Sequence, residues 1–268
     1  MKNKIDAEIC MTKIPQKYTV KTKAEKRADK VFSLFTYSIL ITLCTNIIGS
    51  KAECSKRFEG VNQELFVNNA FNIPVTLPIS NGTVNLNIKK CFNREQLNQI
   101  LKGISELDDV AKGIDFTVSF SDRDMNKSIN IKSHTDIRNQ SIVDDSYGFA
   151  NIRANAFSGK ITYPVNLYLN TKDIDSNSKN CSSIIKHELM HCLGFTDLID
   201  DEYMDYLMYY TDCGNKDLSF NEKVALNTVY SPKNTGYVKI KKPVKVNYQK
   251  IKDTYFNQVS ASENEFIC

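Results

Sequence analysis

Short runs in which hydrophobic and polar residues alternate dominate the chain between residues 73 and 170, and this period of two predicts β-strands. The first two runs, 73–79 and 83–90, are separated by Ser-Asn-Gly, a turn sequence that predicts a β-hairpin. Four further strands are expected at 114–120, 128–133, 148–157 and 161–170.

Two other segments repeat their apolar residues every three or four positions, which is the period of an amphipathic helix. The first is 93–114, which has Gly113 near its end. The second is expected to begin near Ser182 or Ser183, since either hydroxyl can cap a helix, and to end at Gly194.

A third helix is expected at 219–231, where Pro232 stops it. Strand, helix, several strands, a second helix and a last helix together predict an α+β fold around one sheet. After residue 234 the sequence alternates lysine with apolar residues. It is expected to be a basic C-terminal tail, either a solvated strand or a strip that docks to an acidic partner.

The N-terminus has the pattern of a targeting segment rather than of a folded domain. A basic stretch at 21–30 precedes an uncharged apolar stretch at 31–49, and Ser50 and Ala52 then offer small residues to a signal peptidase. The pattern predicts a signal peptide that is cleaved between Ala52 and Glu53. Because the apolar stretch is long enough to span a bilayer, an uncleaved membrane anchor is the alternative.

Both alternatives send the rest of the chain across a membrane. We therefore expect a secreted or periplasmic protein, or a membrane-anchored one whose folded domain lies outside the cytoplasm. The expected organisation is a targeting segment at 1–52, one folded domain at 53–233 and the basic tail at 234–268.

The composition is typical of a globular protein, with 41% hydrophobic and 25% charged residues among 268. The formal net charge is +4, and much of the positive excess lies in the first thirty residues. The folded part is therefore close to neutral and has no basic pattern that would predict nucleic-acid binding.

The cysteines beyond the targeting segment are even in number, which in an exported chain predicts disulfide bonds. They are Cys54, Cys91, Cys181, Cys192, Cys213 and Cys268. The sequence does not choose among the pairings, and buried thiols are the alternative.

The segment 187–191, His-Glu-Leu-Met-His, contains two of the three histidines of the chain. Residues four apart lie on one face of a helix, one turn from each other, so His187 and His191 can direct both imidazoles at one metal ion. Zinc binds imidazole nitrogen, and Glu188 is placed to reach a water in a remaining coordination position and to act as a general base.

A zinc site needs a third protein ligand. Gly194 can take the left-handed conformation that ends the helix and turns the chain back toward the metal. Asp197, three residues further on, is the expected oxygen ligand, with Asp200 and Asp201 as alternatives. The remaining histidine, His134, lies far upstream on an expected strand or loop.

The segment 187–197 resembles the long zinc-binding motif of the metzincin metallopeptidases, HExxHxxGxxH, with aspartate in the last place as in the snapalysin-like branch. Leu-Met-Tyr-Tyr at 207–210 resembles the methionine turn of these enzymes, and the last predicted helix resembles the one that closes a matrixin-type catalytic domain. The resemblance extends over about residues 70–232 and is specific only over 187–210.

The resemblance implies roles for several other residues. Met208 would form the apolar floor beneath the zinc, and Tyr210 would help to stabilise the transition state. The segment 148–157 would be the edge strand whose backbone pairs with a peptide substrate. Cys192 points about 100° away from His191 on a helix, so we expect it to pack or to form a disulfide rather than to bind metal.

Together these features predict an exported, monomeric zinc metalloendopeptidase with a metzincin-like catalytic domain: a mixed twisted sheet, an active-site helix, a methionine turn and a C-terminal helix. The expected partner is a peptide or protein substrate. Contact with a membrane is expected only through the N-terminal anchor. One alternative is an exported binding module that keeps the fold without turnover, which the presence of Glu188 argues against. Another is a membrane-anchored domain with a structural zinc, which would need a fourth protein ligand.

Overall fold

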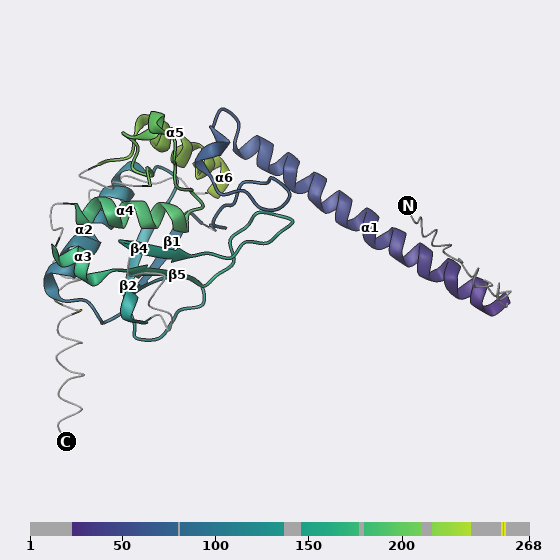
Figure 1. Cartoon of the computed structure of the whole chain (residues 1–268), viewed down its shortest axis with the longest axis horizontal. Helices are drawn as coiled ribbons and strands as arrows, with labels where there is room; N and C mark the ends of the chain where they lie inside the picture. Colours follow the sequence, from purple (N-terminus) through teal and green to yellow (C-terminus); the bar gives the residue numbers. More distant parts are fainter. Residues whose placement is uncertain are drawn as a thin grey trace, which may run out of the picture. The chain divides into compact units, whose positions relative to one another are not determined.

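The computed structural model describes residues 23–79, 81–136, 146–176, 180–210 and 216–236, together with Asp253 and Tyr255. The chain divides into two units, one ending at Thr45 and the other beginning at Asn46. In its described part, the first unit consists of the N-terminal portion of helix α1 (Lys23–Arg57). The second unit contains the sheet and the other helices (Figure 1).

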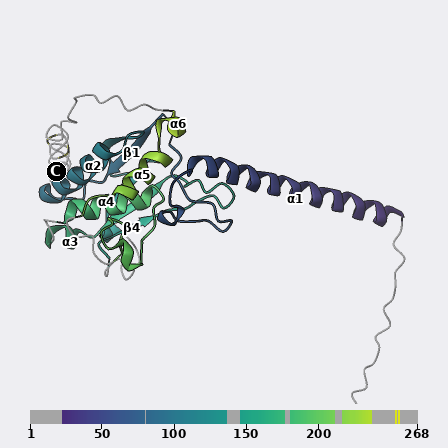
Figure 2. The ribbon, with the colours of Figure 1, turned by 90° about the horizontal axis from the view of Figure 1, so that it is seen from above.

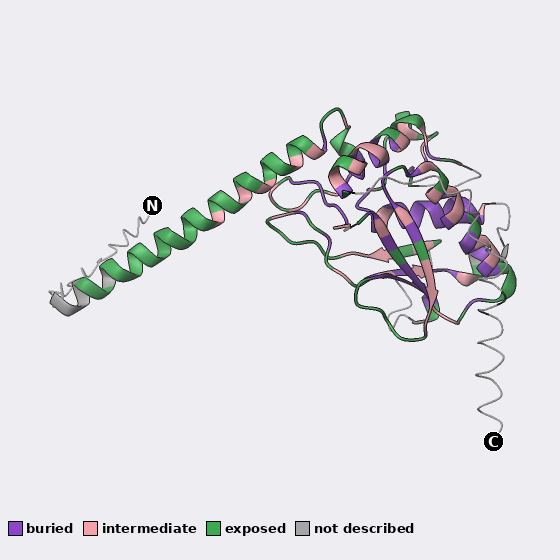
Figure 3. Ribbon diagram, turned by 180° about the vertical axis from the view of Figure 1, so that it is seen from behind, coloured by how far each residue is buried: buried purple, intermediate pink, exposed green. Residues whose placement is uncertain are grey.

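Helix α1 contains the apolar stretch that the sequence assigns to targeting. Large apolar side chains such as Phe32 and Ile48 are 73% and 67% exposed, and Figure 3 colours most of the helix as exposed. Among the described residues, this is the one helix that is long and apolar enough to cross a membrane, from Lys30 to Arg57. The helix continues through the predicted cleavage point after Ala52.

The second unit is built on a five-stranded mixed sheet in the order β2-β1-β3-β5-β4. The pairs β1–β2, β1–β3 and β3–β5 are parallel, and β4 runs antiparallel to β5. The strands are β1 (Thr83–Ile88), β2 (Asp115–Phe120), β3 (Ile129–Ser133), β4 (Gly148–Asn151) and β5 (Val165–Leu169). Strand β4 is therefore an edge strand, and no described strand pairs with its outer edge.

Two helices cover one face of this sheet and pack against each other (Figures 1 and 2). They are α2 (Arg94–Val110) and α4 (Cys181–Cys192). The shorter helices are α3 (Thr171–Ser176), α5 (Phe220–Val229) and α6 (Pro232–Thr235), with 3₁₀ turns at Gln63–Leu65, His134–Asp136 and Asp201–Tyr203. The apolar faces of α2, α4 and the strands form one buried core, which Figure 3 shows as the buried interior of this unit.

Capping residues set where α2 and α5 begin. Asn93 Oδ1 accepts a hydrogen bond from the Gln96 N–H at 2.9 Å, and Gln96 Oε1 accepts one from the Asn93 N–H at 2.9 Å. Ser219 and Glu222 form the same reciprocal capping box at the start of α5. Each box satisfies backbone donors that a helix would otherwise leave without partners.

The predicted strands at 114–120 and 128–133 are confirmed as β2 and β3. The strand predicted at 148–157 is too long, because β4 ends at Asn151. Asn155 Oδ1 accepts hydrogen bonds from the backbone N–H groups of Phe157 and Ser158 at 2.9 and 3.0 Å, and these bonds form a turn instead of a strand.

The predicted hairpin between 73–79 and 83–90 is wrong. The Asn-Gly turn does form, with positive φ at Asn81 and Gly82, but β1 continues into the centre of the sheet. Both edges of β1 are taken by parallel strands, so none is left for 73–79. Thr76 instead pairs with the segment that precedes β5: its N–H bonds to the Gly159 carbonyl at 2.9 Å.

The predicted caps of the second helix are also wrong. Helix α4 begins at Cys181 with Asn180 as its N-cap, so Ser182 and Ser183 lie inside the helix. The Ser183 hydroxyl donates a hydrogen bond to the Lys216 carbonyl at 2.7 Å instead of capping the helix. The third predicted helix is confirmed as α5, and Pro232 begins the short helix α6 instead of ending the helical region.

The two ends of the folded part are tied to the core. The backbone of the segment after α1 bonds to the segment after α4: the Val67 N–H to the Gly194 carbonyl at 2.9 Å, and the Thr196 N–H to the Leu65 carbonyl at 3.0 Å. In the tail, the buried Tyr255 donates a hydrogen bond to the Phe92 carbonyl at 3.0 Å. Most of the tail lies outside the described residues.

The cysteine predictions are only partly within the described residues. Cys54 and Cys192 carry free thiols in the structure, and Cys192 is buried in the core, as expected for a packing residue. The structure therefore does not support the predicted disulfides of Cys54 and Cys192. Cys213 and Cys268 lie outside the described residues, so a disulfide between these two stays a prediction.

Candidate metal centre

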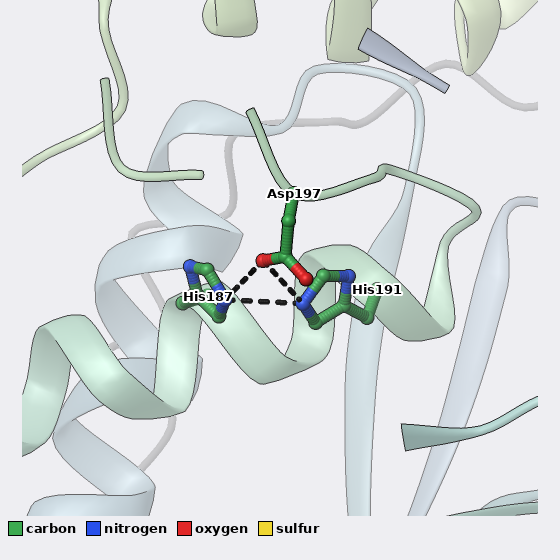
Figure 4. Close-up of side chains that lie close together, drawn as sticks. All are labelled: His187, His191 and Asp197. Carbon is green, nitrogen blue, oxygen red and sulfur yellow. Dashed lines mark hydrogen bonds and ion pairs between the residues drawn. The ribbon is translucent and has the colours of Figure 1, made fainter. Parts of the chain in front are cut away.

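The side chains of His187, His191 and Asp197 converge on one point (Figure 4). The two Nε2 atoms of the histidines are 3.0 Å apart. Asp197 Oδ1 lies 3.2 Å from Nε2 of His187 and 3.3 Å from Nε2 of His191. One carboxylate oxygen and two imidazole nitrogens therefore form a compact triangle of atoms that can bind a metal.

Backbone carbonyl groups fix the orientation of both imidazole rings. His187 Nδ1 lies 2.9 Å from the Leu207 carbonyl oxygen, and His191 Nδ1 lies 3.0 Å from that of Phe195. A carbonyl oxygen only accepts, so each Nδ1 carries the proton and each Nε2 is left with a lone pair. Metal-binding histidines in proteins are typically held in this way.

The turn after α4 brings Asp197 back to the histidines. Gly194 has φ +102°, in the left-handed region that the sequence predicts, and its N–H bonds to the His191 carbonyl at 2.9 Å. A Cβ at this position would lie 2.1 Å from the Val75 carbonyl oxygen. Glycine is therefore required both by the conformation and by the close approach of the neighbouring backbone.

The charges around Asp197 stabilise its ionised form. Burial alone would raise the pKa of this carboxyl. When the rings of His187 and His191 also carry a proton on Nε2, their hydrogen bonds and positive charges hold the pKa of Asp197 well below its usual range. Three atoms with lone pairs at separations of 3.0–3.3 Å repel one another unless a proton or a cation lies between them. Two imidazole nitrogens and one carboxylate oxygen are a ligand set that suits zinc.

Glu188 is buried beside this triangle, with 5% of its surface exposed. Its Oε2 atom has no hydrogen-bond partner among the described residues, which is rare for a buried carboxylate oxygen. Burial raises the pKa of Glu188, an effect that the charges of His191 and His187 oppose and that of Asp197 reinforces. A carboxylate in this setting is prepared to accept a proton.

Strand β4 runs directly over Glu188. A Cβ on Gly148 would lie 2.7 Å from both Cγ and Cδ of Glu188 and 3.0 Å from its Oε1. Only a residue without a side chain leaves room for the carboxylate here.

A cleft of about 660 Å³ opens beside the three candidate ligands. The edge strand β4 is part of its lining, and so are Phe195 and Tyr210 from later in the chain. The rest of the lining is both apolar and polar: Val67, Ser146, Tyr147, Ile152 and Thr196. The cleft thus joins an unpaired strand edge to the candidate metal ligands.

The segment around Met208 supports the ligands from behind. Met208 is fully buried, and its carbonyl accepts a hydrogen bond from the Leu198 N–H at 2.8 Å. The buried carboxylate of Glu222 accepts hydrogen bonds from the N–H groups of Met208 at 2.8 Å and Leu207 at 3.2 Å. Leu207 in turn holds His187, so Glu222 acts on a candidate ligand through the backbone.

The structure separates the other candidates from the triangle. Tyr210 lines the cleft and is 56% exposed. Asp200 is exposed, and Asp201 accepts a hydrogen bond from the Tyr209 hydroxyl at 3.4 Å. His134 is buried elsewhere, where its Nδ1 accepts a hydrogen bond from the Thr171 N–H at 3.3 Å. None of these residues belongs to the group of metal-binding atoms found among the described residues.

Sequence reasoning missed two residues that shape this site, Gly148 and Glu222. A glycine inside a predicted strand is a signal of close backbone approach, and it could have directed attention to Gly148. The pattern Ser219-x-x-Glu222 predicts a capping box. It does not reveal that the same carboxylate bonds to a turn that lies earlier in the chain.

No model of a known protein family matches the chain, and no curated protein matches its sequence. Among solved structures, the chain is similar to high choriolytic enzyme 1, a hatching-enzyme zinc-protease from the medaka fish Oryzias latipes. The two are 14% identical with a TM-score of 0.35, over 63% of this chain and 96% of that chain. At this level of similarity the neighbour assigns no activity to this chain.

Proposed function

We propose that this chain is a zinc-dependent metalloendopeptidase that works outside the cytoplasm. The observation that carries the proposal is the geometry of the candidate metal centre. Atoms of His187, His191 and Asp197 converge to within 3.3 Å of one another beside the buried carboxylate of Glu188, which has an oxygen without a partner. The metzincin-like motif in the sequence agrees with this geometry.

His187, His191 and Asp197 would hold the zinc, because their three atoms already face one point and each histidine is oriented by a carbonyl. When bound, zinc would lower the pKa of a water molecule and polarise the carbonyl of the scissile bond. Three protein ligands leave a coordination position open, which distinguishes a catalytic from a structural zinc site. Among the described residues, no fourth histidine, cysteine or acidic side chain belongs to this group of metal-binding atoms.

Glu188 would be the general base. Its burial and raised pKa favour acceptance of a proton from the attacking water and its later transfer to the leaving amine. Tyr210 also lines the cleft, and we assign its hydroxyl to stabilisation of the negative charge that develops on the carbonyl oxygen. Met208, which is buried in the core, would provide the apolar support beneath the ligands.

The substrate would bind as an extended peptide along β4. The outer edge of this strand has no described partner, and Gly148, Phe149 and Ala150 line the cleft. Pairing through the backbone positions a peptide without reading its sequence. The apolar side chains in the lining, among them Val67, Phe149 and Ile152, offer contacts to hydrophobic side chains of the peptide.

We infer a position outside the cytoplasm from helix α1, which is apolar and long enough to cross a membrane. Export with cleavage after Ala52 and retention as an anchored protein are distinguished by the mass of the protein after expression in a secreting host. A mature protein that begins at Glu53 supports release, and an intact chain in the membrane fraction supports the anchor.

The test of the activity compares metal content and peptide cleavage in the full chain, purified in detergent, and in Glu188→Gln. Glu202, an exposed acid in the 3₁₀ turn Asp201–Tyr203, provides the control variant Glu202→Gln. We expect close to one zinc per chain in all three proteins. Cleavage of a mixed peptide library should be present in wild type and Glu202→Gln, lost with a chelator, and reduced by a factor of roughly 10² or more in Glu188→Gln.

The outcomes separate the alternatives. Zinc without cleavage in wild type would favour a binding module, and a folded protein without zinc would overturn the proposal. Equal cleavage by wild type and Glu188→Gln would show that Glu188 is not the general base.

A further inference from the structure

A second cavity of about 560 Å³ lies apart from the metal centre and shares none of its lining residues with the cleft. Its walls come from the segment before β1, the first residues of β1, the loop at 126–127 and the end of α5 with α6. The volume is within the range of cavities that bind small molecules. The proposed peptidase activity makes no use of this cavity.

Three cations line the cavity, namely Arg57, Lys127 and Lys160, and no aspartate or glutamate is part of the lining. Two of them meet at Thr76. Arg57 Nη1 donates a hydrogen bond to the Thr76 hydroxyl at 3.4 Å, and the backbone of Lys160 forms a β-bridge with the same residue. The fold therefore places the Arg57 guanidinium and the backbone of Lys160 beside the same residue.

The third cation comes from a different part of the chain. The carbonyl of Lys127 lies 3.5 Å from the Asn85 amide on β1, and Asn85 also lines the cavity. The Lys127 ammonium forms no ion pair with a described residue. A cation in a cavity without an acid is expected to attract an anion from solution.

A carboxylate outside the cavity compensates only part of this charge. Glu53 lies 3.6 Å from Arg57 and 3.7 Å from Lys160, and its side chain is 58% exposed. Exposed pairs at such distances contribute little. Three cations therefore face one exposed carboxylate, and the cavity keeps a net positive charge.

The remaining lining offers one neutral donor and an apolar wall. Burial raises the pKa of Tyr163 to about 12, so its hydroxyl keeps its proton at neutral pH, and no described residue forms a hydrogen bond with it. Leu77, Ile79 and Val229 form the apolar part. The cavity thus combines a cationic side with an apolar one.

We propose that this cavity is a binding site for a phosphate-bearing ligand, whose phosphate group contacts Arg57, Lys127 and Lys160. Guanidinium and ammonium groups are the side chains that bind phosphate most strongly in proteins. The apolar wall accommodates the group that the phosphate is attached to. The phosphate comes either from a free phosphomonoester or from a phospholipid headgroup, a source made relevant by the position of Arg57 at the end of the apolar helix α1.

The test measures ligand binding by calorimetry to the full chain in phosphate-free maltoside micelles at constant ionic strength. The probes are inorganic phosphate, glycerol 3-phosphate and a short-chain phosphatidylglycerol. The variant Lys127→Glu/Lys160→Glu reverses two of the cations. Lys112→Glu/Lys172→Glu is the matched control. Both of these lysines are exposed and lie outside the cavity, and the two double substitutions change the net charge by the same amount.

We expect at least one probe to bind the wild-type chain and the matched control with similar affinity. The variant Lys127→Glu/Lys160→Glu should bind about 10-fold more weakly or worse, the loss expected for a charge-assisted hydrogen bond. Binding of glycerol 3-phosphate without phosphatidylglycerol assigns a free phosphomonoester, and the reverse assigns a lipid headgroup.

Two results would overturn the proposal: no binding of any probe to the wild-type chain, or equal weakening in the cavity variant and the matched control. If the charge reversal prevents folding, as judged by circular dichroism, Lys127→Gln/Lys160→Gln replaces it. The experiment does not depend on zinc or on peptidase activity, so its result and that of the proposed function are independent.

Discussion

The buried carboxylate of Glu222 holds the backbone of Met208: its Oε1 accepts a hydrogen bond from the Met208 N–H at 2.8 Å. Its Oε2 accepts hydrogen bonds from Leu207 at 3.2 Å and from the helix cap Ser219 at 2.6 Å. Because the Leu207 carbonyl orients the ring of His187, one side chain on α5 both caps its own helix and supports a candidate metal ligand.

Replacement of Glu222 by glutamine should therefore affect both stability and metal binding. The amide group of glutamine would point a donor at backbone donors, so we expect a loss of about 2–4 kcal/mol in the free energy of unfolding. Zinc affinity should fall by about 10–100-fold, as is typical when a residue that orients a metal-binding histidine is lost. Urea unfolding of the metal-free protein and a competitive zinc titration measure the two effects. In the exposed control Glu95→Gln both should stay near wild type, and unchanged zinc affinity in Glu222→Gln would contradict the coupling.

The third ligand is tested by comparing Asp197→Asn with Asp200→Asn. Asp197 Oδ1 lies 3.2 and 3.3 Å from the two imidazole nitrogens, whereas Asp200 is exposed and outside the group. Loss of the charged ligand should weaken zinc binding by more than about 100-fold. This is a larger effect than the loss of a residue that only orients a ligand. It should also remove most of the thermal stabilisation that excess zinc gives to wild type. The melting temperature with and without zinc measures this, and a larger effect of Asp200→Asn would reassign the ligand.

Gly148→Ala should impair catalysis while leaving zinc bound. The added Cβ would lie 2.7 Å from Cγ and Cδ of Glu188, so the carboxylate has to move away from its present position. A displacement of about 1 Å at a catalytic group typically lowers the rate by about 10²-fold. We expect kcat to fall by this order with one zinc still bound per chain. Ala154→Val, at an exposed position further along the same segment, is the control, and full activity of Gly148→Ala would show that the contact does not matter.

The ion pair between Asp124 and Lys132 should make stability depend on pH. The two side chains are 2.6 Å apart, and Lys89 lies 3.1 Å from the same carboxylate. Burial alone would raise the pKa of Asp124, but the hydrogen bonds and charges of Lys132 and Lys89 lower it. A carboxyl whose pKa is lowered by folding adds stability above its unfolded pKa, and this contribution is lost as the pH falls through its folded pKa.

At pH 7 we expect the free energy of unfolding of Asp124→Asn to be about 1–2 kcal/mol lower than that of wild type. This is less than for a fully buried pair, because the Asp124 side chain is 40% exposed. The difference between wild type and variant should shrink below about pH 4, where Asp124 in the unfolded chain is protonated. Urea unfolding at pH 7 and pH 3 tests this. The control Asp122→Asn, 3.7 Å from Lys90 and 66% exposed, should be nearly neutral, and a pH-independent difference for Asp124→Asn would refute the argument.

The sequence by itself determined the local features of the site. Histidines four apart on a helix must face the same side, and glycine three residues after His191 permits the left-handed turn that redirects the chain toward Asp197. In the same way, the apolar periodicity and the polar caps determined where α2, α5, β2 and β3 lie. These properties depend on backbone geometry over a few residues, so they can be predicted without knowledge of the fold.

Only the tertiary structure decided which segments meet. The runs at 73–79 and 83–90 have a turn sequence between them, but parallel strands from distant parts of the chain take both edges of β1. The contact of Gly148 with Glu188 and the bonds from Glu222 to the turn at Met208 join residues that are 40 and 14 positions apart. Such pairs are selected by the packing of the whole core and by the need of buried polar groups for partners, and neither leaves a periodic signal in the sequence.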